Sequence, residues 1–459
     1  MIETLKQIDL KEYGSKQWFS QHENLDRLNI QAHKNAMGAS DEFVMDQFVS
    51  HDKVSLLVES LLTAEVWKQK VFPLIKEDVA KISSLKSYIC MYHEASICNL
   101  LEIMLYHRTA CENSEDALVE LIDYCYRKFV AITHKADEYE KRRDKAPEKV
   151  DPRAYLEQNA VEELEKQAEE IDLSCSMIAL SLVRFITDHL ESLSVPVVHQ
   201  LMENNDMPCM LVPLLELKPW LRKNAKGETE KFEDQKWQVV PPSESSKLTK
   251  IEAQIWLSIY NMFLSQDGNR KYEITTFRKS NLLRLRKYLN EQLLDQLPML
   301  TAMLRALEEM SMMGDNPIGQ TNSFIVQQLP EMRVKIMRDR DWPAIAKYQM
   351  QNFFNTEVNN PKDELDSLMK LYSSDAYDNF MDDPKCACCG DGATQRCSRC
   401  KGEWYCSREC QLKQWKQHKK MCEMLSQMKQ EETKRKEVQR EVIKEQQEAK
   451  KKPLIEELN

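Results

Sequence analysis

Eight of the fourteen cysteines lie between Cys386 and Cys422, near the C-terminal end of a chain of 459 residues. Thiolate and imidazole groups are the ligands that Zn²⁺ prefers, and a structural zinc site holds four of them in a tetrahedron. Eight ligands make two such sites and leave no coordination position open for catalysis. The sequence therefore predicts two structural zinc ions. The ligands form four couples with spacings C-x2-C, C-x2-C, C-x3-C and H-x3-C: Cys386 with Cys389, Cys397 with Cys400, Cys406 with Cys410, and His418 with Cys422.

The spacing of the four couples leaves open which of them share a metal ion. A C-x2-C turn lets two thiolates meet one ion, and ligands four residues apart lie on the same side of a helix. Sequential and interleaved pairing of the couples both give one Cys₄ and one Cys₃His site. Cys388 is left over, and we interpret it as a spectator because eight ligands already fill two tetrahedra. So short a segment buries little apolar surface, so zinc would replace a hydrophobic core.

Composition limits the function classes. The net charge is -10, which disfavours the long basic face that nucleic-acid binding needs. The sequence contains no run of eighteen apolar residues, so we expect no transmembrane segment. The N-terminal stretch MIETLKQIDLKEYGSK lacks the features of a signal peptide. We therefore expect a soluble intracellular protein, in which clustered cysteines hold metal rather than disulfides. The remaining cysteines are expected to be small buried thiols in helices: Cys90, Cys98, Cys111, Cys125, Cys175 and Cys209.

The rest of the chain predicts an all-α body over residues 1–380. Only nine glycines occur, and leucine-rich segments with helical periodicity are found nearly everywhere. Ser194 and Pro196 indicate the start of one helix, and Pro208 indicates the start of the next. Such helix pairs recur, which favours an irregular solenoid of the armadillo or HEAT type over the alternative of an irregular helical bundle.

Four polar segments interrupt or follow this body. Residues 137–152 and 222–247 are expected to be surface loops, the second with a small hairpin. Residues 381–385 would form a tether to the cysteine-rich module at 386–422. The tail, residues 423–459, would be a charged helix or partly disordered, since it lacks the apolar heptads of a strong coiled coil.

No enzyme motif is complete, so we expect no catalytic and no cofactor-binding residue. In GDNPIGQT, Gln320 stands where a phosphate-binding loop needs lysine. In HEASI, Ile97 replaces the second histidine of a zinc protease, which leaves His93 and Glu94 for capping or buried hydrogen bonds. A methyltransferase of the SET type would need glycine-rich cofactor turns that are missing here.

The four couples and the run WYCSRECQLKQWKQHKKMC resemble the MYND zinc finger. This resemblance implies interleaved pairing, with Cys386, Cys389, Cys406 and Cys410 on one zinc ion and Cys397, Cys400, His418 and Cys422 on the other. MYND fingers bind short peptides that often contain proline. The resemblance places Gln411 and Trp415 in the peptide groove. The alternative is that Trp415 only packs against Trp404 or Tyr405.

The runs QHENLDRLNIQA, EVWKQKVFP, YHEASICNLLE and LDQLPML extend the resemblance over most of residues 15–422. They resemble a family of MYND-finger proteins that act as cytoplasmic assembly factors for axonemal dynein arms. The resemblance implies a non-enzymatic scaffold needed for motile cilia, in the cytoplasm and enriched near the centrosomes or basal bodies of ciliated cells. Implied partners are a leucine-rich-repeat dynein assembly factor, axonemal dynein subunits, and Hsp90-type chaperones with their co-chaperones. The alternative is a nuclear co-repressor adaptor that binds proline-containing peptides of transcription regulators.

Overall fold

The computed structural model divides the chain into two compact units, Met1–Leu371 and Tyr372–Asn459. The predicted tether at 381–385, the predicted tail at 423–459, residues 147–152 of the first predicted loop and Gln320 lie outside the described residues. The structure describes residues 1–37, 42–82, 85–146, 160–244, 246–264, 272–313, 328–354 and 386–422, the last range without 390, 392, 401–402, 416–417 and 420–421.

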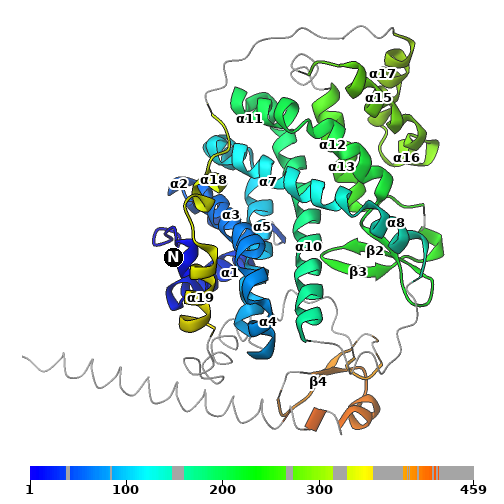
Figure 1. Cartoon of the computed structure of the whole chain (residues 1–459). Coiled ribbons are helices and arrows are strands. Elements are labelled where there is room, and N and C mark those ends of the chain that lie inside the picture. The colour runs from blue at the N-terminus through cyan, green and yellow to red at the C-terminus, as the bar shows by residue number, and fades with distance from the viewer. Residues whose placement is uncertain are drawn as a thin grey trace, which may run out of the picture. The chain divides into compact units, whose positions relative to one another are not determined.

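The first unit is built from helices around α5 (Leu85–Leu105) and α10 (Ala160–Asp188), as Figure 1 shows. Helix α5 packs against α1, α3 and α10, and α10 also contacts α7 and α13. The other elements before α10 are η1 (Leu10–Glu12), α1 (Lys16–Met37), α2 (Phe43–Ser50), α3 (Val54–Lys70), α4 (Phe72–Ile82), α6 (Arg108–Asn113), α7 (Glu115–His134) and α8 (Ala136–Asp144).

Shorter helices follow α10. Ser194 is the N-cap of α11, and both α11 and α12 carry a proline in their first turn, as the sequence predicts. The helical elements are η2 (Leu190–Ser192), α11 (Val195–His199), η3 (Gln200–Asn204), α12 (Met207–Leu217), η4 (Pro242–Glu244), α13 (Lys250–Leu264), α15 (Thr276–Leu283), η5 (Arg284–Tyr288), α16 (Glu291–Gln296), α17 (Leu300–Met312), α18 (Met332–Met337) and α19 (Trp342–Asn352).

The hydrophobic core lies where α3, α5, α7 and α10 meet. Leu57, Leu61 and Trp67 of α3 are fully buried. Helix α3 ends at Lys70, and Pro73 lies in the first turn of α4, where its missing N–H costs no helical hydrogen bond. Five of the six scattered cysteines are buried and the sixth is partly buried, as free thiols. The prediction of a mostly helical body is confirmed, whereas the armadillo- or HEAT-like repeat stays a prediction.

A small antiparallel sheet, β1 (Leu221–Lys223), β2 (Thr229–Glu233) and β3 (Lys236–Val239), covers part of the second predicted loop. The predicted hairpin is thus extended by a third strand. Asp234 and Gln235 have φ values of 49° and 60°, which fit a two-residue turn between β2 and β3. Phe232 is buried and meets Trp237 edge to face, with ring centroids 5.2 Å apart.

The first part of the loop predicted at 137–152 is helical, which corrects that prediction. Helix α8 has acidic residues in its first turn and basic residues in its last turn, which complements the helix dipole. Glu138 and Arg142 form an ion pair one turn apart. Arg143 Nη1 donates to the carbonyl oxygens of Glu216 and Leu217 at 3.0 Å and so attaches α8 to the end of α12.

Residues 328–354, here called the closing segment, return to the N-terminal region (Figure 1). Gln349 is fully buried: its Oε1 accepts from Trp67 Nε1 at 2.9 Å, and its Nε2 donates to the carbonyl oxygens of Leu10 and Lys11. Arg340 adds a two-pronged ion pair with Asp9 at 2.8 and 2.9 Å. The closing segment therefore fixes the first residues of the chain against α3.

Across the described residues, no helix combines the length and the apolar character that a membrane span requires.

Candidate metal centre

Short elements position the cysteines of the second unit. Strand β4 (Gln395–Arg396) pairs with β5 (Trp404–Tyr405), and one cysteine follows each strand directly. Cys406, after β5, precedes a helical stretch at 408–415, and in its first turn the backbone N–H of Cys410 donates to Ser407 Oγ. The two C-x2-C couples each form a tight turn. These elements bring couples that are distant in sequence next to each other.

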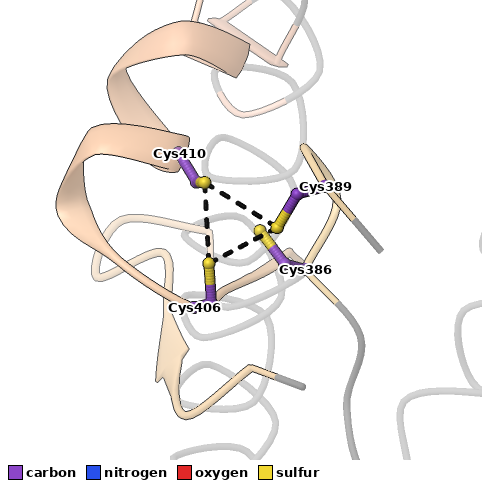
Figure 2. A group of neighbouring side chains, drawn as sticks. All are labelled: Cys386, Cys389, Cys406 and Cys410. Carbon is purple, nitrogen blue, oxygen red and sulfur yellow. Dashed lines mark hydrogen bonds between the residues drawn. The ribbon is translucent and has the colours of Figure 1, made fainter. Parts of the chain in front are cut away.

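The first cluster joins Cys386, Cys389, Cys406 and Cys410, whose Sγ atoms point toward one another in Figure 2. The Sγ atoms of Cys389 and Cys406 lie 3.5 Å apart, those of Cys406 and Cys410 3.5 Å, and those of Cys410 and Cys389 3.9 Å. A tetrahedral zinc site with Zn–S bonds of about 2.3 Å needs sulfur separations of about 3.8 Å. A disulfide would need about 2.05 Å. The four sulfurs therefore fit a zinc ion.

The second cluster joins Cys397, Cys400, His418 and Cys422, all of them buried. Cys397 Sγ lies 3.7 Å from Cys422 Sγ, and Cys400 Sγ lies 3.4 Å from His418 Nε2. These separations fit a Cys₃His tetrahedron in the same way. The first couple thus shares its site with the third, and the second with the fourth, which is the interleaved arrangement.

Backbone N–H groups lower the pKa of one thiol in each cluster. Desolvation raises the pKa of Cys386, but hydrogen bonds from backbone N–H groups, including those of Cys388 and Cys389, outweigh it and lower that pKa to about 6. Cys397 has the same balance, with N–H groups of Arg399 and Cys400 lowering its pKa to about 6. Because zinc binds the thiolate, both turns favour the form that a metal ion requires.

Both clusters therefore hold the donor set of a structural Zn²⁺ ion. When bound, each ion would supply the cross-link that a module without a large core lacks. All four ligands of each cluster are protein side chains, which leaves no open position of the kind that catalytic zinc uses.

Cys388 lies outside both clusters. Its thiol is partly exposed and interacts with Cys410; desolvation, followed by this interaction, raises its pKa. The position agrees with its interpretation as a spectator.

Aromatic rings pack around the second cluster. Trp415 is partly buried and meets the ring of His418 at a centroid distance of 5.9 Å, while the buried Tyr405 meets it at 6.2 Å. Trp415 thus supports a cluster residue, and its role in a peptide groove stays a prediction, as does that of the half-buried Gln411. Leu412, which is 66% exposed beside Gln411, was not among the residues predicted from the sequence. An apolar residue between polar ones on this helix was the signal for it.

His93 and Glu94 of the HEASI stretch lie in the body and make different contacts. His93 is buried with its Nδ1 atom 2.9 Å from Nδ1 of His22, and Glu94 forms ion pairs with Lys68 and Lys128. Neither belongs to a group of three or more metal-ligating side chains among the described residues, where such groups are confined to the two clusters above. The sequence predicts capping or buried hydrogen bonding for these two residues, and these contacts are of the second kind.

Comparison with known proteins agrees with this geometry. Residues 386–422 match the family model of the MYND finger, so the fold and the site define a helical protein with a C-terminal MYND zinc finger. The chain is also 28% identical over 447 residues to a protein of Drosophila melanogaster named "Zinc finger MYND domain-containing protein 10 homolog", covering 92% of this chain and 96% of that relative. No solved structure matches the chain. These findings indicate a protein-interaction adaptor.

Proposed function

We propose that this chain is a non-enzymatic cytoplasmic scaffold for the preassembly of axonemal dynein arms with chaperones, and that motile cilia need it. The observation that carries the proposal is that similarity to the fly relative covers both the helical body and the finger, rather than the finger alone. Four sequence runs in the body resemble dynein-arm assembly factors, and this resemblance is the reason for proposing dynein-arm assembly as the process.

The two units suit two binding tasks. The finger, with all eight ligands inside its clusters, would recruit the leucine-rich-repeat assembly factor through an exposed surface that includes Leu412. The helical body would hold dynein subunits and Hsp90-type chaperones with their co-chaperones. Neither task requires turnover, as expected of a scaffold; its location in the cytoplasm near the sites of cilium formation is part of the proposal.

The test is mass spectrometry of the proteins that co-purify from ciliating cells with the intact chain and with a Cys406→Ala, His418→Ala variant. This variant removes one ligand from each cluster. We expect dynein subunits and chaperones on both baits, and loss of a leucine-rich-repeat partner from the variant. Zinc content, measured on the same samples, should fall from two ions per chain.

Cys388→Ser is the matched control because it changes a finger cysteine outside both clusters. It should keep the zinc and every partner. If the double variant kept all partners despite losing zinc, the recruiting role of the finger would be wrong. Chromatin regulators in place of dynein subunits would favour the nuclear co-repressor alternative.

A further inference from the structure

A cleft of about 1260 Å³ opens in the helical body between α7, α8, α10 and strand β1, next to the end of α3. Sites for small molecules are usually about 300–1,000 Å³. This cleft is therefore large enough for a segment of polypeptide. Figure 1 shows α8 and the sheet together on the side of α10 where the cleft lies.

The floor of the cleft is a group of four charges that balance one another. Lys68 bonds Glu94 at 2.8 Å and Asp172 at 2.7 Å, and Lys128 bonds the same two carboxylates at 2.7 and 2.8 Å. Tyr124 Oη also donates to Glu94 at 2.7 Å. The two lysines and Glu94 are buried, whereas half of the Asp172 side chain is exposed to the cleft. The floor is thus ordered and carries no net charge.

The rim, in contrast, has a surplus of positive charge. Ten basic and seven acidic residues line the cleft, although acidic residues exceed basic ones by 74 to 64 in the whole chain. Lys141 and Lys145, at the end of α8, form no ion pair with any residue that the structure describes. Lys223 of β1 donates to Thr229 Oγ1 at 2.8 Å, and the acid near it, Asp144, is itself paired with Arg143.

Aromatic rings give this rim flat apolar contacts. The guanidinium of Arg222 lies over Trp237, 4.1 Å from the ring centroid, and its Nε donates to Glu230 at 2.7 Å. On α8, which packs against β1, Arg142 lies 5.8 Å from the ring centroid of Tyr139. Both guanidinium groups are already paired with carboxylates, Arg222 with Glu230 and Arg142 with Glu138, so they shape the rim and leave the binding of an anion to the lysines.

We infer that this cleft binds an acidic segment of a partner protein, with carboxylates of that segment on Lys141, Lys145 and Lys223. The inference deepens the proposed function, since it names the chemistry that the body would recognise in a client. A nucleic acid fits less well, because the seven acidic residues of the lining would repel a continuous row of phosphates. A mixed lining of this kind suits a peptide, whose charges are separated by apolar and polar residues.

The test is fluorescence anisotropy with the purified full-length chain and a labelled acidic peptide in which glutamates are separated by alanine and serine residues. The cleft variant carries Lys141→Glu, Lys145→Glu and Lys223→Glu. Its matched control carries Lys6→Glu, Lys16→Glu and Lys347→Glu, which make the same change in net charge at exposed positions outside the cleft. We expect the affinity of the cleft variant for the peptide to be lower by a factor of about ten or more. The control should bind like the intact chain at moderate salt.

A milder variant and a competing nucleic acid distinguish the possible outcomes of this test. A milder variant with the same three lysines changed to glutamine should give an intermediate affinity and would replace the charge reversals if those failed to fold. Equal weakening by the cleft variant and the control, or no binding to the intact chain, would overturn the inference. Oligothymidylate that displaces the acidic peptide at equal charge would do the same and assign the cleft to nucleic acid. Binding of the peptide without dynein subunits in the co-purification would instead refute the proposed function alone.

Discussion

At the scale of single residues, His22 and His93 form a buried contact that should make the body sensitive to pH. Their Nδ1 atoms lie 2.9 Å apart, so one ring must donate and the other accept. Both side chains are buried, and Trp18 packs against both rings. Desolvation by burial lowers the pKa of both histidines, and for His93 the charge of His22 lowers it further. The folded body therefore holds the pair neutral.

Acid should accordingly weaken the fold before the carboxylates titrate. Below the ordinary histidine pKa of 6.5 the unfolded chain binds protons that the folded chain does not, so stability is complete above this pH and falls as the pH drops. Each of the two histidines should cost up to about 1.4 kcal/mol per pH unit. Urea unfolding from about pH 7.5 to about pH 5.5 would measure the loss.

The variant His93→Gln should lose less stability over this interval, because one of the two buried titrating groups is gone. His51→Gln, at an exposed position, is the control and should keep the full pH dependence. The same slope in His93→Gln and the intact chain would show that the pair does not govern acid sensitivity.

At the scale of elements, the closing segment depends on one amide side chain. Gln349 satisfies the indole N–H of Trp67 and two backbone carbonyl groups in a fully buried position. Gln349→Ala would remove the partner of the buried Trp67 indole N–H, take one hydrogen bond from each carbonyl group and open a cavity, so we expect the free energy of unfolding to fall by about 2–4 kcal/mol. Chemical denaturation of the purified chain measures this difference.

Gln351 offers a matched control, since it lies in the same helix but is exposed. Gln351→Ala should change the free energy of unfolding by less than about 0.5 kcal/mol. An equally small effect of Gln349→Ala would mean that the closing segment contributes little to the body.

Local signals and long-range contacts were predictable to different degrees. Proline and serine punctuation located α11 and α12, because helix starts depend on neighbouring residues. Helix α8 was missed, because its polar sequence shows no apolar stripe and its order comes from charge pairs and from Arg143 on α12. The ligand couples followed from spacing, but their interleaving needed the resemblance. Contacts such as Trp67 with Gln349, 282 residues apart, leave no local pattern.

At the scale of the whole molecule, the two compact units should respond independently to metal removal. The body has its own hydrophobic core, whereas the finger has a small one made mostly of zinc ligands. A chelator should therefore unfold the finger and leave the melting temperature of the body unchanged, within about 1 °C. Circular dichroism during heating, with and without chelator, measures this. A lower melting temperature of the body after chelation would contradict the independence of the units.

The rate of zinc release to a chelator should distinguish the two clusters. Cys389 of the first cluster is exposed, whereas all four ligands of the second are buried. Zinc should leave the first cluster faster, which a colorimetric metal indicator would record as two phases. His418→Ala, which changes only the second cluster, should lose the slow phase.

The closing segment also bears on how the protein is made. Leu10 is bonded to a residue that the ribosome adds 339 positions later, so the first turns of the chain wait through most of translation for their partner. During that time Trp67 and the apolar surface around it lack their cover. A premature stop codon before Gln349 would give a truncated protein whose apolar surface around Trp67 is exposed to chaperones and proteases. Nascent chains of this protein should therefore depend on holding factors until the body is almost fully synthesised.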